Sequence, residues 1–137
     1  MTQKQSTGIT PEMTPESEFW WEKISEHELH VQACHDCEKK WFPPVYRCPY
    51  CASKNWEWVK TSGQGKVFSW TVVHRAFDPA FAEDLPYTVL TVELEEGAKI
   101  LGRLIPSDDR FSLKADMPVK ATFYKVGDQT LLGFAKI

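Results

Sequence analysis

The residues in this chain that are best suited to chemistry are four cysteines, which form two Cys-x2-Cys pairs separated by ten residues. They are Cys34, Cys37, Cys48 and Cys51. A Cys-x2-Cys turn points two thiolates at one cation, and two such turns complete the tetrahedral four-thiolate site of a structural zinc ribbon. Because that site has no open coordination position, the thiols would act as ligands and not as nucleophiles. Iron in the same cage is the alternative, since tetrahedral sulfur sites suit both metals.

Disulfide bonds are a second use for four cysteines, in a secreted domain. The first 17 residues are polar and contain Pro11 and Pro15, so they lack the apolar run of a signal peptide. We therefore favour the metal site and expect a cytoplasmic protein. No stretch approaches the roughly 18 apolar residues that a membrane helix needs, so we expect no membrane association.

Length and charge limit the classes of protein that fit. The chain has 137 residues, enough for one ordinary domain or for two very small domains that share a core. Its net charge is −3 and its isoelectric point is about 5.8. Only residues 34–60 have a positive balance, with five basic and three acidic side chains. Nucleic-acid-binding domains usually have a basic patch and a high isoelectric point, so nucleic acid is disfavoured as a partner.

An N-terminal helix is predicted over residues 15–28, after a disordered tail at residues 1–13. Thr14 is a suitable N-cap and Pro15 suits the first helical position. A helix this short is not stable alone in water, so its aromatic face must pack on this chain's own core or on a partner subunit. The candidate residues for a partner interface are Phe19, Trp20, Trp21, Trp41 and Phe42.

The remaining sequence has the patterns of β-strands. Residues 29–33 lead into the first cysteine pair and residues 56–60 leave the second, as the strands of a ribbon would. After a turn at Gly63 and Gly65, further strands are predicted over residues 67–76, 87–95, 99–105, 119–126 and 130–137. Residues 106–116 form a polar connection with room for one helical turn. Five strands with the long gap between the third and the fourth match a Greek-key barrel of the OB type.

The predicted fold class is therefore mainly β. Its three parts are a disordered tail and helical arm at residues 1–33, a zinc ribbon at 34–60 and an OB-fold barrel at 61–137.

This order of parts resembles the family of rubredoxin-like zinc ribbon plus OB-fold proteins known as domain of unknown function 35 (DUF35). The matching stretches are Phe19-Trp20, both cysteine pairs, Pro43-Pro44, the segment from Gly63 to His74, Pro86-Tyr87, the segment from Val92 to Gly97, and Met117-Pro118-Val119. The resemblance covers roughly residues 15–137. The chain departs from the family at Glu38 and Ala52, which follow the two cysteine pairs where the family often has glycine.

The resemblance implies an accessory role in an assembly. Members of the family are similar to subunits that accompany acyl-CoA thiolases, acyltransferases and retro-aldolases, where a thiolase-superfamily partner holds the catalytic residues. The ribbon–OB subunit supports that partner and helps to shape the channel for acyl-CoA. Aromatic or steroid side-chain acyl-CoAs are plausible substrates by analogy alone.

The residues themselves show no catalytic constellation once the cysteines are assigned to a metal. His74 alternates with apolar residues along a predicted strand, and it is either a hydrogen-bonded structural histidine or a general base. Coenzyme A needs cations for its phosphates and an apolar surface for its pantetheine arm. Arg47 in the ribbon, and Arg75 with Phe77 after the first barrel strand, offer both, although either arginine could be an ordinary surface charge. His74 is the fourth candidate residue for this channel.

Two hypotheses from different classes follow, beside a third in which the chain alone is an acyl-CoA carrier or sensor. The first is a non-catalytic, zinc-binding subunit of a thiolase-like hetero-oligomer that acts on acyl-CoA. The second is a nucleic-acid-binding module, because zinc ribbons and OB barrels both bind nucleic acids and exposed aromatic rings can stack on bases.

Overall fold

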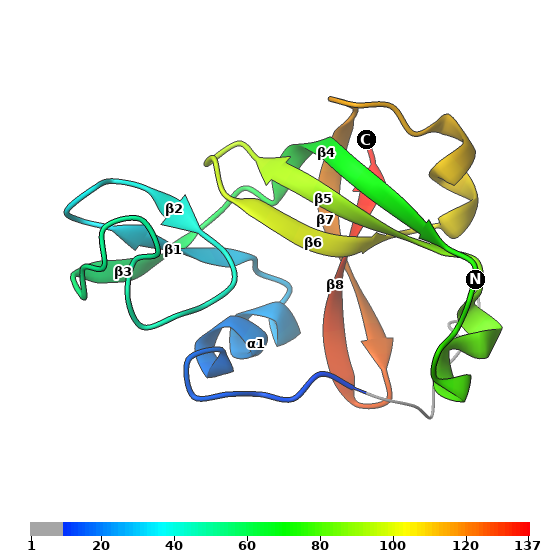
Figure 1. The fold of residues 1–137 in the computed structure, drawn as a ribbon, viewed down its shortest axis with the longest axis horizontal. Helices are drawn as coiled ribbons and strands as arrows, with labels where there is room; N and C mark the ends of the chain where they lie inside the picture. The colour runs from blue at the N-terminus through cyan, green and yellow to red at the C-terminus, as the bar shows by residue number, and fades with distance from the viewer. Residues whose placement is uncertain (1–9) are drawn as a thin grey trace.

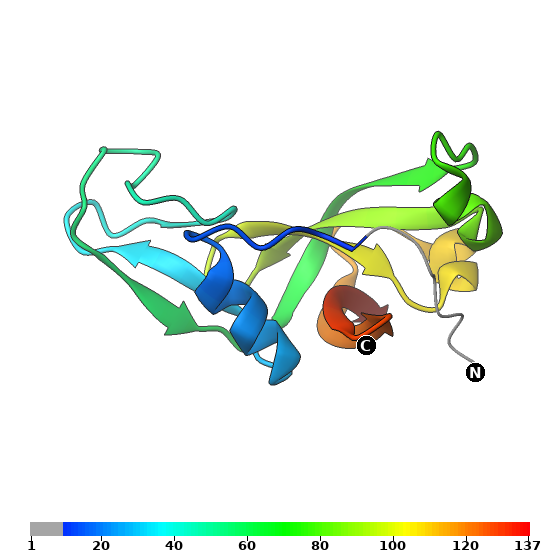
Figure 2. The same cartoon turned by 90° about the horizontal axis from the view of Figure 1, so that it is seen from below.

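Two β-structures lie next to each other along the long axis of the molecule, with a short helix beside their junction (Figure 1). In this computed structural model, which describes residues 10–137, they are a three-stranded sheet of order β2-β1-β3 and a closed barrel of order β4-β5-β6-β8-β7. Figure 2 shows the described part of the N-terminal arm running past the barrel toward helix α1. The mainly β class and the five-stranded barrel predicted from the sequence are confirmed.

The small sheet is the ribbon. Its central strand β1 (His30–Cys34) pairs antiparallel with β3 (Trp56–Lys60) along its whole length and with β2 (Lys40–Trp41) at two positions. The sequence predicted β1 and β3 within one residue, but it did not predict β2. A strand of two residues has no periodicity to detect, and only its pairing with β1 defines it.

The barrel strands lie close to their predicted positions. They are β4 (Gln64–Val73), β5 (Tyr87–Leu94), β6 (Lys99–Leu104), β7 (Pro118–Val126) and β8 (Gln129–Lys136). The 3-10 helix η2 (Ser107–Ser112) occupies the long connection where one helical turn was expected. A second 3-10 helix, η1 (Pro79–Asp84), was not predicted; Asp78 begins it by accepting a hydrogen bond from the Ala80 N–H at 2.9 Å.

Closure of the barrel depends on the short parallel pairing of β6 with β8. Two glycines permit this close approach. A Cβ on Gly102 would lie 2.6 Å from Cδ2 of Phe134, and one on Gly133 would lie 2.9 Å from the carbonyl oxygen of Arg103. Because real Cβ atoms do not approach that closely, these positions exclude any side chain.

Helix α1 (Glu18–Ser25) is shorter than the predicted range of 15–28. Residues 14–17 instead form a turn, in which the Ser17 N–H donates to the carbonyl of Thr14 at 3.0 Å. At the other end His27 adopts a φ of +62°, which a right-handed helix cannot continue. No helix within residues 10–137 has the length and apolarity to cross a membrane.

The helix joins the ribbon to the barrel through one shared core. Trp20 and Ile24 of α1 and Leu29 and Val31 of the ribbon side are buried in the same cluster as the barrel interior. The barrel members of this cluster are Val67, Leu90, Val92, Leu94, Ala98, Ile100, Leu104, Val119, Leu132 and Phe134. The predicted domain boundaries at 33/34 and 60/61 stay a prediction. Strand β1 begins at His30 and crosses the first of these boundaries.

One buried amide ties the loop between the cysteine pairs to the ribbon sheet. The Gln32 side chain is 1% exposed, and its Nε2 donates to the carbonyl of Val45 at 2.7 Å while its Oε1 accepts from the Val45 N–H at 2.9 Å. These two bonds fix the loop against the central strand.

Gln32→Leu should lower the free energy of unfolding by about 1–3 kcal/mol, because the Val45 N–H and carbonyl lose their partner. Chemical denaturation of the metal-loaded protein measures this. Gln129→Leu is the matched control, because the buried Gln129 Nε2 has no hydrogen-bond partner within the described residues. This substitution should lower the free energy of unfolding by less. Equal losses in the two variants would contradict this role of Gln32.

Candidate functional site

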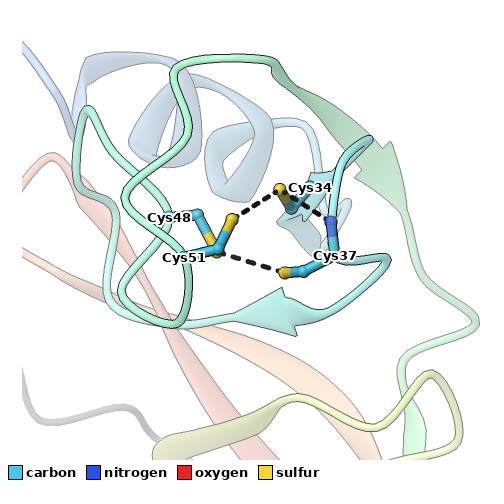
Figure 3. Close-up of side chains that lie close together, drawn as sticks. All are labelled: Cys34, Cys37, Cys48 and Cys51. Carbon is cyan, nitrogen blue, oxygen red and sulfur yellow. Dashed lines mark hydrogen bonds between the residues drawn. The ribbon is translucent and has the colours of Figure 1, made fainter.

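The two cysteine pairs meet in space at one end of the ribbon, where their side chains converge (Figure 3). All four Sγ atoms lie within 4.8 Å of one another, with Cys34 and Cys51 3.6 Å apart and Cys37 and Cys48 3.5 Å apart. A tetrahedral zinc ion with Zn–S bonds of about 2.3 Å requires S–S separations of about 3.8 Å. The four cysteines are therefore positioned to bind a metal ion of that size and geometry.

Backbone N–H groups surround the sulfur atoms and prepare them for a cation. The N–H groups of Cys37 and Asp36 donate to Cys34 Sγ at 3.5 and 3.4 Å, and that of Tyr50 donates to Cys48 Sγ at 3.4 Å. The Cys37 N–H, assisted by that of Asp36, lowers the pKa of the Cys34 thiol to about 7.

The neighbouring sulfur atoms raise the pKa of Cys51 instead. The Ser53 N–H acts to lower the pKa of Cys51, but desolvation and the three other sulfurs outweigh it and raise that pKa to about 12. Four thiols held this close do not all ionise unless a cation neutralises their charge. The chemistry of this donor set thus fits a divalent metal.

The turns that follow the cysteine pairs adopt left-handed backbone conformations. Glu38 has a φ of +64° and Ala52 a φ of +62°, and each donates its N–H to the carbonyl of the first cysteine of its pair, at 3.1 and 2.8 Å. Left-handed φ values favour glycine, because a Cβ then crowds the following carbonyl. At both positions the resemblance led us to expect glycine, and the backbone geometry would suit glycine there.

A small aromatic cluster covers the metal site. Trp41 is buried with Cys34 and Cys48, and Trp56 packs against them. The Trp56 indole N–H donates to the carbonyl of Tyr46 at 2.8 Å, which holds the ring against the loop. The buried cluster contains only Trp41 and the two cysteines among the described residues, so the ribbon has little apolar core of its own.

The histidines do not form a site. His35 is exposed beside the cysteines, with Nε2 3.3 Å from Oε2 of Glu57 and outside the sulfur cluster. His74, the candidate general base, is exposed after the end of β4. Both roles suggested for it stay predictions.

The arginine candidates for coenzyme A lie far apart. Arg47 is exposed in the ribbon and donates to the carbonyl of Ala52 at 3.2 Å. Arg75 is exposed after β4, with its guanidinium 5.2 Å from the ring centre of Phe77. The ribbon and the segment after β4 are at opposite ends of the long axis (Figures 1 and 2). This chain therefore does not bring the two arginines into one site.

The aromatic residues suggested for a partner interface divide into two groups. Trp20 and Trp41 are buried by this chain's own residues. Phe19, Trp21 and Phe42 are half-buried; Trp21 and Phe42 pack against the core, and Phe19 contacts the rings of His30 and Trp58. An interface role for these three stays a prediction.

Other apolar side chains that sequence reasoning passed over are exposed on the barrel. They are Phe68 and Trp70 on β4, Leu101 on β6, and Phe111 in η2. Phe77, which was singled out, is 89% exposed. Alternation along β4 could not have identified Phe68 and Trp70 as exposed, because the pairing of β4 with β5 shifts register between Val67 and Ser69.

Two family models match consecutive parts of the chain, the first over the ribbon and the second over the barrel. A model described as "ChsH2, rubredoxin-like zinc ribbon domain" matches residues 21–57, and one described as "ChsH2, C-terminal OB-fold domain" matches residues 58–124. The fold and the cysteine site therefore define the class of zinc ribbon–OB-fold proteins.

Individual relatives narrow this class to a family. A "DUF35 domain-containing scaffold protein" of Methanocaldococcus jannaschii is 35% identical over 111 residues, which cover 77% of this chain and 75% of the relative. The solved structure described as "Ltp2-ChsH2(DUF35) aldolase" matches with a TM-score of 0.78 and 32% identity, over 93% of this chain and 98% of that chain. The chain belongs to the DUF35 family, as the resemblance predicted.

A longer relative carries the same unit as part of a larger protein. The "Probable enoyl-CoA hydratase alpha subunit" of Thermomonospora curvata is 36% identical over 95 residues, or 69% of this chain. That match spans only 29% of the relative's own length. The match therefore does not assign the activity of the whole relative to this chain.

The metal site can be tested by removing one ligand. Cys48→Ser should reduce bound metal from about one equivalent to nearly none and unfold the ribbon, because metal binding to four thiolates contributes about 10–16 kcal/mol to the folding of small zinc domains. Elemental analysis and a thiol titration measure this. His35→Ala is the control and should keep its metal; loss of metal there, or retention in Cys48→Ser, would contradict the proposed ligand set.

The left-handed turn gives a second test. Ala52→Gly should raise the free energy of unfolding of the metal-loaded protein by about 1 kcal/mol, since glycine relieves the strain at φ +62° but adds freedom to the unfolded chain. Ala135→Gly in strand β8 is the matched control and should be destabilising by about 1 kcal/mol. Destabilisation in both variants would show that Ala52 is not strained.

Proposed function

We propose that this chain is a non-catalytic subunit of a hetero-oligomeric enzyme whose thiolase-like partner acts on acyl-CoA. The observation that carries this proposal is the likeness, over nearly the whole of both chains, to the DUF35 chain of a structure described as an Ltp2–ChsH2 aldolase. The partner would hold the catalytic residues, and the reaction would be thiolysis, acyl transfer or retro-aldol cleavage of a carbon–carbon bond. The bulky aromatic and steroid side-chain acyl-CoAs are the substrates we favour.

The metal in this proposal is zinc. Four thiolates with no open position suit a closed structural site, and the metal would hold the ribbon together without taking part in the reaction. Iron gives the same geometry but absorbs visible light, so a colourless protein with one equivalent of zinc supports the proposal.

The exposed apolar residues of the barrel support docking to a partner. Large hydrophobic side chains such as Phe68, Trp70 and Phe111 are exposed at intervals along it. Aromatic residues are enriched in protein interfaces, where burying them excludes water from the contact. A catalytic partner that covers these side chains would account for them.

Arg75 and Phe77 are the residues that we propose to contact coenzyme A in the assembled complex. Both are exposed, and the guanidinium already lies over the ring. A phosphate could pair with the guanidinium while the pantetheine arm packs on the ring. Arg47 would need a different ligand, because it lies at the ribbon end of the molecule.

Co-purification from the native host at low salt tests the subunit proposal. We expect a stoichiometric partner with a thiolase fold, activity toward acyl-CoA only in the complex, and loss of that activity when this chain is removed. A chain that purifies alone, or a complex that keeps full activity without it, would overturn the proposal.

Arg75→Ala should raise the KM of the complex for acyl-CoA roughly 10-fold while leaving kcat nearly unchanged, because a charge-assisted hydrogen bond to a phosphate is lost. Steady-state kinetics at fixed ionic strength measure this. Arg47→Ala is the matched control and should leave KM unchanged. If KM increased for Arg47→Ala alone, the coenzyme A site would lie on the ribbon and not beside Arg75.

One observation favours the nucleic-acid alternative. The ribbon exposes Tyr46 and Tyr50, and the Lys39 ammonium lies 4.6 Å from the ring centre of Tyr50. Aromatic rings beside cations can stack on bases and pair with phosphates. Binding of the purified chain to oligonucleotides with a steep dependence on salt concentration would favour this function, and salt-independent or absent binding would exclude it.

A further inference from the structure

Strand β4 has one edge that the rest of the barrel leaves open. Within the part of the chain that the structure describes, β4 pairs with β7 over Gln64–Lys66 and no further, and the Val67 N–H donates to the carbonyl of Met117 at 3.0 Å on the same side. On its other side β4 pairs with β5 as far as Val73. Residues 68–73 therefore form an open edge of the barrel sheet, where β4 continues past β7 (Figure 1).

Both faces of this edge are exposed. In a strand that rests one face on a core, every second residue is buried, but the four successive residues 68–71 are exposed. Trp70 is 40% exposed, although its pairing partner Leu90 on β5 is fully buried. Beyond the bulge between Val67 and Ser69, β4 therefore leaves the barrel interior and meets solvent on both faces.

The main-chain groups on the open edge belong to Trp70 and Val72. The Glu95 N–H donates to the carbonyl of Gln64 at 3.0 Å, so the odd-numbered residues of β5 are the ones that bond to β4. The residues opposite them beyond the bulge are Ser69, Thr71 and Val73. The alternation of an antiparallel pair then directs the N–H and carbonyl groups of Trp70 and Val72 away from β5.

The sequence of the edge does not protect it. Residues 68–73 are Phe-Ser-Trp-Thr-Val-Val, which include no charged residue and no proline. Proteins usually place such residues on exposed edge strands, because an unprotected edge pairs with other strands. An edge of aromatic and β-branched residues is thus suited to the addition of a further strand.

We propose that the added strand is β4 of a second copy of this chain, antiparallel to the first, with the two-fold axis at Thr71. This register places Trp70 of each copy opposite Val72 of the other, where their free N–H and carbonyl groups bond to each other. It is also the register that pairs all of residues 69–73 with the same residues of the second copy.

The side chains are self-complementary in this register. An aromatic ring opposite a β-branched side chain is a stabilising cross-strand pair, and the two-fold axis supplies the pair of Trp70 with Val72 twice. At the axis Thr71 lies opposite Thr71 of the second copy, which is also a favourable pair. A two-fold contact uses the same edge in both copies, so it leaves no open edge for a third.

The charges at the two ends of the edge are complementary as well. Asp116 lies beside one end, where its N–H donates to the carbonyl of Val67 at 2.8 Å, and its side chain is 78% exposed. Lys66 lies 3.7 Å from Asp116 and 3.6 Å from Glu93, so this cluster has one net negative charge. Arg75 follows the other end and is exposed. Antiparallel pairing brings Arg75 of each copy toward Asp116 of the other.

The second copy does not depend on the catalytic partner proposed above. A partner that covers Phe68 and Trp70 would displace it, and Arg75 would then be free to meet coenzyme A. Every measurement below uses the isolated, metal-loaded chain, so the failure of this inference and the failure of the proposed function are distinguishable.

Sedimentation velocity between about 1 and 100 µM tests the pairing, since an interface of this size is expected to dissociate in the micromolar range. Thr71 is exposed and lies opposite itself, so a charge placed there repels its own copy. Thr71→Lys and Thr71→Glu should each weaken the dimer at least about 10-fold. An equimolar mixture of the two variants should restore it, because Lys then lies opposite Glu.

Leu101→Lys is the matched control. Leu101 is exposed on β6, away from the open edge, so this variant should dimerise like the original chain. If Leu101→Lys abolished the dimer while Thr71→Lys did not, association would occur through the apolar barrel face, and the edge pairing would be wrong.

Hydrogen exchange of the unmodified chain tests the register without any substitution. The amides of Trp70 and Val72 should exchange at least about 10-fold more slowly at the concentration that favours the dimer than at the dilute one. The amides of Ser69, Thr71 and Val73 bond to β5 and should be protected at both. A chain that stays monomeric at every concentration, a mixture of charged variants that does not associate, or unchanged exchange at Trp70 and Val72 would each overturn the proposal.

Discussion

The convergence of four sulfur atoms is the constraint on which the ribbon depends. The ribbon is a sheet of three short strands, and the buried cluster around its cysteines holds only Trp41, Cys34 and Cys48. Such a cluster cannot offset the conformational entropy of the two loops that meet there. A metal ion that binds all four thiolates would supply the missing free energy, because its site does not exist in the unfolded chain. The left-handed turns at Glu38 and Ala52 are tolerated for the same reason.

The metal site is joined to the barrel through α1. Trp20 and Ile24 share one core with Leu29 and Val31 on one side and with the barrel interior on the other. A helix of eight residues has little stability alone, and tertiary packing supplies what its own hydrogen bonds do not. The same packing leaves a groove between α1 and the barrel.

The surface of the barrel exposes several large apolar side chains. The exposed apolar side chains lie on the barrel, and Arg75 with Phe77 follows β4 at the end of the molecule opposite the ribbon (Figure 1). This separation is consistent with a division of roles in which the metal maintains the structure and the barrel meets the partner and the substrate. Membership of the DUF35 family, shown by relatives that match most of the chain, agrees with a supporting role in an enzyme assembly.

The sequence by itself determined the local features of this protein. The spacing of the cysteines predicted that the four sulfur atoms meet. Runs of β-branched and aromatic residues, separated by turn residues, predicted the barrel strands within about three residues. Both signals depend on near neighbours in the chain. Tertiary structure alone decided which aromatic residues are buried, that Arg47 and Arg75 lie at opposite ends, and that Gly102 and Gly133 permit closure of the barrel. Those outcomes depend on contacts between residues far apart in sequence. The short strand β2 and the groove beside Trp20 have no signature in the local pattern, since each exists only where separate segments meet.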